Sequence, residues 1–109
     1  MVTAETAVVL PVLLLVLAAA VAAVVVVGGQ LRCVDAAREG ARAAARGEDT
    51  ASVRALVDRA APDGARTAVS GGDTVTVTVR ATIAPLGPLP VRFTVTASAT
   101  ALREPGSAP

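Results

Sequence analysis

The first quarter of the chain is one block of apolar residues. From Ala7 to Gly29 no side chain carries a charge or a hydrogen-bonding group. A helix of that length extends about 35 Å, and the hydrocarbon core of a bilayer is about 30 Å thick. The pattern therefore predicts a transmembrane helix segment over residues 1–31. The alternative, a buried core helix, is disfavoured because the rest of the chain is too short to cover it on all sides.

The helical pattern continues beyond the apolar block. Residues 32–46 are rich in Ala and Arg, which are strong helix formers, so we expect the helix to extend into water. Gly40 lies in the middle of this extension at a cost to helix stability, which indicates a close contact with the sheet. Pro11, inside the apolar block, is expected to kink the helix because it removes one backbone hydrogen bond.

A second, shorter helix is predicted over residues 50–61. Residues 47–50 break the first helix, and Asp49 or Thr50 can cap the second. The apolar residues of this segment recur on one face.

The remainder alternates between apolar and polar residues, which is typical of half-buried strands. Strands are predicted over residues 66–70, 74–84 and 91–101, and the Gly-rich connection at 71–73 makes the first two a hairpin. In the third strand the residues expected to face inward are Val91, Phe93, Val95, Ala97 and Ala99.

The predicted fold class is therefore α+β. An N-terminal transmembrane helix extends into a long amphipathic helix, followed by a second short helix and a three-stranded antiparallel sheet. Residues 32–102 would form this small α+β domain, and 103–109 would be a disordered tail.

Composition narrows the possible functions. The chain has 109 residues, a net charge of +1 and no His. The charge balance argues against a nucleic-acid partner. Without His or Lys we find no catalytic constellation, and the scattered acids and single thiol form no metal site. We therefore expect a non-enzymatic protein without a cofactor, a metal or a small-molecule substrate.

Cys33 has two interpretations. It could form an intermolecular disulfide if it faces an oxidising compartment. It could instead be a small buried apolar residue.

Charged residues near the apolar block are the remaining candidates for function. Glu5 stands at the edge of the block, where it is either a functional charge or an acid favoured by the helix dipole. Arg38, Arg42 and Arg46 share one face of the helical extension. They would serve as a face for lipid head groups or a partner subunit, or as an ordinary solvated face.

Two stretches resemble the TadE-like family. Its members are minor pilins or pseudopilins of tight-adherence type IV pili. The first is the sequence from Val2 to Pro11, with an acid, a short apolar stretch and a proline inside the membrane helix. The second is the sequence from Asp35 to Ala45, which is similar to the helix that follows the membrane segment in this family. Together they cover roughly residues 2–46.

The resemblance implies a structural role in assembly. In type IV pilins a prepilin peptidase removes a basic leader, and the fifth mature residue is a Glu that pairs with the N-terminal amine of a neighbouring subunit. Glu5 falls at that position if Met1 is the first mature residue, and no leader precedes Met1 in the given sequence. The implied partners are membrane lipid, other pilin subunits, an assembly ATPase, platform proteins and, if a leader exists, the peptidase.

Membrane orientation separates this hypothesis from its alternative. A pilin would lie in the cell membrane with its C-terminal domain extracellular, or in a pilus. However, Arg32 and the three later arginines follow the apolar block, and the positive-inside rule would then keep the domain in the cytoplasm. The alternative is a bitopic membrane protein whose cytoplasmic domain binds a membrane partner.

Overall fold

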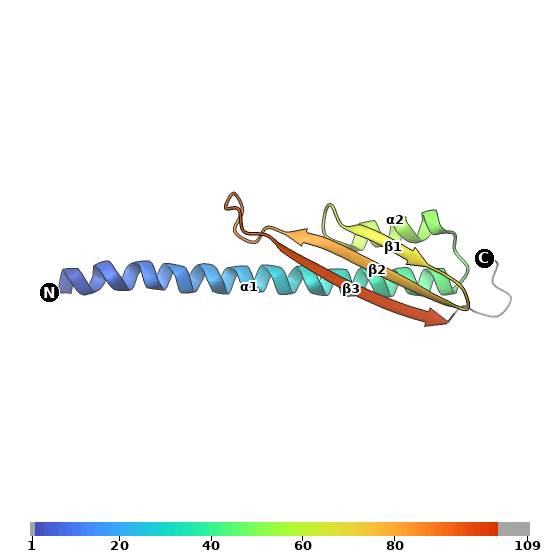
Figure 1. Ribbon diagram of the computed structural model, residues 1–109, viewed down its shortest axis with the longest axis horizontal. Helices are drawn as coiled ribbons and strands as arrows, with labels where there is room; N and C mark the ends of the chain where they lie inside the picture. Colours follow the sequence, from blue (N-terminus) through green and yellow to red (C-terminus); the bar gives the residue numbers. More distant parts are fainter. Residues whose placement is uncertain (1, 103–109) are drawn as a thin grey trace.

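The computed structural model describes residues 2–102. Two helices, α1 (Val2–Ala45) and α2 (Thr50–Ala60), precede three strands, β1 (Arg66–Ser70), β2 (Thr74–Ile83) and β3 (Phe93–Leu102). In Figure 1, α1 forms a long rod, and the other elements lie along its C-terminal half. The predicted α+β arrangement is confirmed.

Helix α1 is continuous through Pro11. In the view of Figure 1, α1 runs past this position without a visible bend, so the expected kink is not seen there. Proline removes a single backbone hydrogen bond, and the helical residues on both sides hold the direction of the axis.

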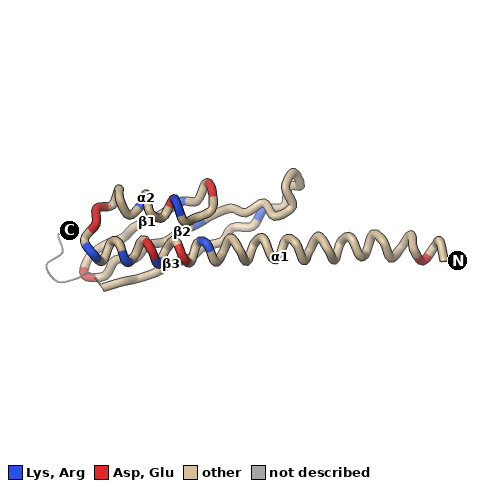
Figure 2. The backbone as a smooth tube through the Cα atoms, turned by 180° about the vertical axis from the view of Figure 1, so that it is seen from behind, with Lys and Arg blue, Asp and Glu red and all other residues tan. Residues whose placement is uncertain are grey.

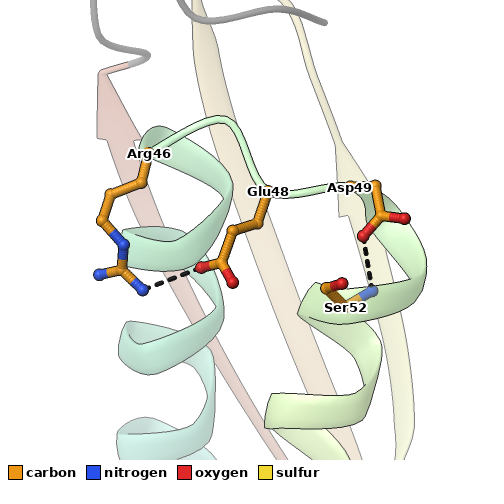
Figure 3. A network of polar contacts seen from close by, with 4 residues as sticks. All are labelled: Arg46, Glu48, Asp49 and Ser52. Atoms are coloured by element: carbon orange, nitrogen blue, oxygen red, sulfur yellow. Dashed lines mark hydrogen bonds and ion pairs between the residues drawn. The ribbon is translucent and has the colours of Figure 1, made fainter.

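The end of α1 is defined by Gly47, as the sequence pattern predicted. Gly47 has a φ of 90°, a left-handed conformation that glycine adopts without strain. Its amide donates to the carbonyl of Ala44 at 3.0 Å, and the amide of Glu48 donates to that of Ala43 at 3.2 Å. This pair of bonds is a Schellman motif and satisfies carbonyls that the helix end would otherwise leave unpaired. Figure 3 shows an ion pair across this turn, where Arg46 Nη2 lies 2.9 Å from Glu48 Oε2.

Asp49, not Thr50, caps α2. Its side-chain carboxylate accepts a hydrogen bond from the backbone amide of Ser52 at 3.0 Å (Figure 3). Hydrogen bonding by Ser52 holds the pKa of the Asp49 carboxyl below its ordinary value. The side chain of Ser52 has the larger effect and its backbone amide the smaller one. The cap therefore acts best with the carboxyl ionised.

The sheet is antiparallel with the strand order β1-β2-β3. Val77 is the central residue, paired with Val69 on one side and Ala99 on the other. Helix α1 packs across β2 and β3, and α2 packs beside α1 and β1. The opposite face is polar, and hydroxyl pairs such as Thr76–Thr100, 3.0 Å apart, link β2 to β3.

The core between the helices and the sheet is made of small residues. Valines from α2 and β2, Val53, Val57, Val75, Val77 and Val79, are at most 1% exposed. They meet a face of α1 composed largely of alanine, and these residues of α1 are buried: Cys33, Ala36, Ala37, Gly40, Ala41, Ala43, Ala44 and Ala45. A helix without long side chains on its inner face can lie close to the sheet.

Element boundaries differ from the predictions by one or two residues, and one difference matters. Strand β3 begins at Phe93 rather than at 91, and Val91 and Phe93 are 36% and 45% exposed instead of facing inward. Val91 lies in the connection before β3 and Phe93 begins this edge strand, so both are beyond the packed centre of the domain. The predicted tail, 103–109, lies outside the described residues.

Gly40 is the tightest point of the helix–sheet contact. A Cβ atom added to it would lie 2.6 Å from Val57 Cγ2 and 3.1 Å from Val77 Cγ1. Both valines are fully buried and stiff at χ1, so they cannot easily move aside. The expected close contact at Gly40 is present, and it involves α2 as well as the sheet.

We predict that Gly40→Ala destabilises the domain. Overpacking a core costs about 1–3 kcal/mol, which exceeds the gain of about 1 kcal/mol in helix propensity. A net loss near 1 kcal/mol speeds amide exchange in β2 by about fivefold, measurable by hydrogen–deuterium exchange of the full chain in detergent micelles. Gly28→Ala is the matched control, since a Cβ there meets nothing within 4 Å. Equal exchange rates in the two variants would contradict the packing argument.

We further predict that α2 loses protection in acid through Asp49. The lowered pKa means that its contribution to stability is present above the pKa of the unfolded chain, about 3.9, and is lost as the pH falls through the folded value. Asp49→Asn should keep the cap but remove this part of the acid dependence, whereas Asp49→Ala should weaken α2 at every pH. Hydrogen exchange of α2 across the acid range checks both, and an unchanged pH profile in Asp49→Asn would contradict the role of the charge.

Candidate membrane and assembly surface

The N-terminal half of α1 presents large apolar side chains on all sides. Leu13, Leu15 and Val24 are between 57% and 73% exposed. None of the most apolar stretch is buried within the described residues. A buried core helix is thereby excluded for this segment. Helix α1 is long and apolar enough to cross a membrane.

A shallow hollow of about 430 Å³ lies on this apolar surface. Ala23, Val24, Val27, Gly28 and Leu31 line it. Two of the five residues have small side chains or none, and small residues let a second helix approach closely in lipid. The hollow could receive a side chain of a neighbouring helix.

Glu5 lies in the first turn of α1 and is exposed. Next to it, Thr6 Oγ1 donates to the carbonyl of Val2 at 2.9 Å, so that hydroxyl is paired within the helix. Figure 2 shows an acidic position near the N-terminus, separated from the other charges by a long uncharged stretch. Pro11 is also exposed and lies in the apolar block.

Arg38, Arg42 and Arg46 are exposed on the side of α1 that faces away from the sheet. Asp35 and Glu39 accompany them along the extension, and Figure 2 shows both charge signs mixed there. Arg46 pairs with Glu48, the one ion pair among residues 2–102. The guanidinium groups of Arg38 and Arg42 thus remain available to an anionic partner.

Cys33 lies on the inner face of α1 with no exposed surface. Burial raises the pKa of its thiol, and the nearby Arg32 guanidinium only partly offsets this effect. A protonated, enclosed thiol reacts poorly. The geometry therefore favours the packing role over an intermolecular disulfide, which requires the thiol to be accessible.

Two polar contacts that the sequence did not predict fasten the domain where the apolar block ends. Gln30 Nε2 donates to the carbonyl of Thr96 in β3 at 3.1 Å. Arg32 Nη2 donates to the carbonyl of Ala61, just after α2, at 3.0 Å. In the sequence, the only sign of these contacts is that Gln30 and Arg32 are the first long polar side chains after the apolar block. Their partners lie far along the chain, so only the folded structure reveals them.

The described part of the chain offers no metal-binding cluster. Across residues 2–102, no group of three or more His, Cys, Asp or Glu side chains is placed to hold a metal ion. A further hollow, of about 220 Å³, lies on the outer face of the hairpin, where Arg66 and Arg80 line it.

These features define a class: a small α+β domain built on the C-terminal extension of a helix that is able to cross a membrane. The model of the TadE-like protein family matches residues 1–42, which include the apolar block and most of the extension. The resemblance noted from the sequence is confirmed over this segment. Searches of curated proteins and of solved structures gave no match. The family match and the apolar helix fit a membrane protein associated with a tight-adherence pilus system.

Proposed function

We propose that the chain is a minor pilin or pilus-assembly component of a tight-adherence type IV pilus system. Its role is structural and non-catalytic, and it assembles through the apolar part of α1. The α+β domain lies on the extracellular side of the cell membrane or on the surface of the pilus. Its partners are membrane lipid, other pilin subunits and the platform proteins of the assembly machinery, with a prepilin peptidase if a leader exists.

One observation carries this proposal: the TadE-like match covers an apolar helix that no part of the described domain buries. In water such a surface is unfavourable, at roughly 25 cal/mol per Å² of apolar area. Either lipid or other apolar helices must cover it. A bundle of subunit helices provides the same environment as the membrane, so one surface can serve before and after assembly.

In this proposal, Glu5 sets the axial position of the apolar helix relative to the helix of a neighbouring subunit. An unpaired carboxylate near lipid is costly, and pairing it with a cation removes much of that cost. The N-terminal amine of a neighbouring subunit is the cation that the family resemblance supplies. Only one axial position of the neighbouring helix would bring amine and carboxylate together.

The alternative is a bitopic membrane protein with a cytoplasmic domain, and the charge distribution is the observation that favours it. Arg32, Arg38, Arg42 and Arg46 all follow the apolar block. The positive-inside rule would place such a flank in the cytoplasm.

The side of the membrane on which the domain lies decides between these functions. We expect Ser70→Cys, exposed at the far end of β1, to react with a membrane-impermeant maleimide on intact cells. The parent chain is the matched control, because its buried Cys33 should stay unlabelled even after native lysis. Labelling of Ser70→Cys only after lysis would contradict the pilin proposal and favour the cytoplasmic domain.

We predict that Glu5→Ala inserts into the membrane normally but is lost from the pilus. Removing the carboxylate leaves the apolar helix intact and deletes the pairing charge. Glu5→Gln should fail as well, because it keeps the size of the side chain but not its charge. The comparison uses immunoblots of sheared pili and of membranes. Thr6→Ala, a change at the adjacent exposed position, should assemble like the parent. Normal incorporation of both Glu5 variants would disprove the pairing role.

A further inference from the structure

The loop between β2 and β3, residues 84–92, is apolar, and it is exposed apart from the buried Pro85 and the half-buried Leu86. Three of its nine residues are prolines, and the other large side chains are Leu86, Leu89, Val91 and Arg92. Leu89 is 56% exposed, and Phe93, the only aromatic residue of the chain, is 45% exposed directly after the loop. Apolar side chains gathered on a loop mark a surface that contacts a partner or a membrane.

The loop is held in shape by its own backbone. The amide of Gly87 donates to the carbonyl of Ala84, and the amide of Leu89 donates to that of Leu86, both at 3.4 Å. Gly87 has a φ of 62°, which suits the turn. Proline has no amide hydrogen, so three of the nine loop positions present no backbone donor. Such a backbone can leave water at a smaller cost than an ordinary loop.

The loop begins and ends level with the last turns of the apolar block. A Cβ atom added to Gly29 would lie 2.8 Å from Ile83 Cδ1, at the end of β2. Val26, one turn earlier in α1, packs against the core of the domain. Figure 1 shows the loop extending from this point further along α1, towards its N-terminus.

This position places the loop at lipid level if α1 spans the bilayer through its apolar block. Gly29 would then lie near the membrane boundary. Each helical residue towards the N-terminus is about 1.5 Å deeper. A loop that runs beyond Gly29 in that direction therefore enters the interfacial layer.

The charges at this end of the domain fit a membrane surface. Arg92 is exposed at the end of the loop, and Arg66 lies directly opposite Arg80 on the outer face of the hairpin. Like charges directly opposite each other are unfavourable unless an anion lies between them. Asp63, in the turn before β1, offsets only part of this positive charge. Lipid phosphates would complement the excess of guanidinium groups.

We propose that the β2–β3 loop is a second membrane contact. Leu89, Val91 and Phe93 insert into the interfacial layer on the domain side of the bilayer, and Arg92 binds lipid phosphate. Anchoring at α1 and at the loop fixes the tilt of the domain on the membrane. This inference rests on the proposed membrane span but not on the pilus role, so either can fail without the other.

The test uses tryptophan as a reporter, since the parent chain has no Trp or Tyr. Leu89→Trp places the indole in the loop. Leu102→Trp is the matched control, because Leu102 is 76% exposed and lies at the opposite end of β3. Each full-length variant is reconstituted in vesicles of phosphatidylcholine and phosphatidylglycerol. Some of these lipids carry bromine near the head-group end of the acyl chain, and circular dichroism verifies equal folding.

We expect the Leu89→Trp emission to be shifted to the blue and quenched by the brominated lipids. Interfacial segments lie about 5–10 Å into the boundary between head groups and acyl chains, which is the depth of those bromines. Leu102→Trp should be quenched by aqueous iodide instead. Equal iodide quenching of both variants, without lipid quenching of Leu89→Trp, would overturn the proposal. A blue shift without lipid quenching would also overturn it, because protein and not lipid would then be covering the loop.

Discussion

The close approach of α1 to α2 and β2 is the contact on which the rest of the structure depends. Gly40 and the alanines around it leave room for Val53, Val57 and Val77, which fill the space that longer helical side chains would otherwise occupy. Small domains gain little from burial, and this core contains valine and alanine almost exclusively. Its stability must come from close packing rather than from large side chains. A single added methyl group at Gly40 therefore disturbs two elements at once.

This packing also joins the domain rigidly to the apolar helix. Because the sheet lies directly on the continuation of α1, no linker separates the apolar block from the folded domain within residues 2–102. Gln30 and Arg32 add hydrogen bonds to β3 and to the end of α2 at the junction. In the proposed function, the register that Glu5 sets between helices would be transmitted directly to the position of the domains.

The junction has a second consequence for the loop between β2 and β3. In a domain on a flexible tether, Leu89 and Phe93 would be exposed apolar residues without a defined environment. Here their height relative to the apolar block is set by the contact between Ile83 and Gly29. The proposed insertion of the loop follows from this height together with the composition of the loop. The membrane would then act on the domain through two contacts, one along α1 and one at the end of the sheet.

The sequence by itself determined the elements and their order. An uncharged run from Ala7 to Gly29 can only be covered by lipid or protein, and the strict alternation from Thr74 to Ile83 has one apolar face. The helix stop at Gly47 and the position of Glu5 before the apolar block could also be predicted, because each depends on neighbouring residues alone.

The tertiary structure decided what depends on distant partners. It buried Cys33 against the sheet, and it brought Gln30 and Arg32 to carbonyls that lie far along the chain. It also left Val91 and Phe93 exposed, although their alternation matches that of the buried residues later in β3. Alternation gives the face of a strand on which a side chain lies, but not how much of that side chain its neighbours cover at the edge of the sheet.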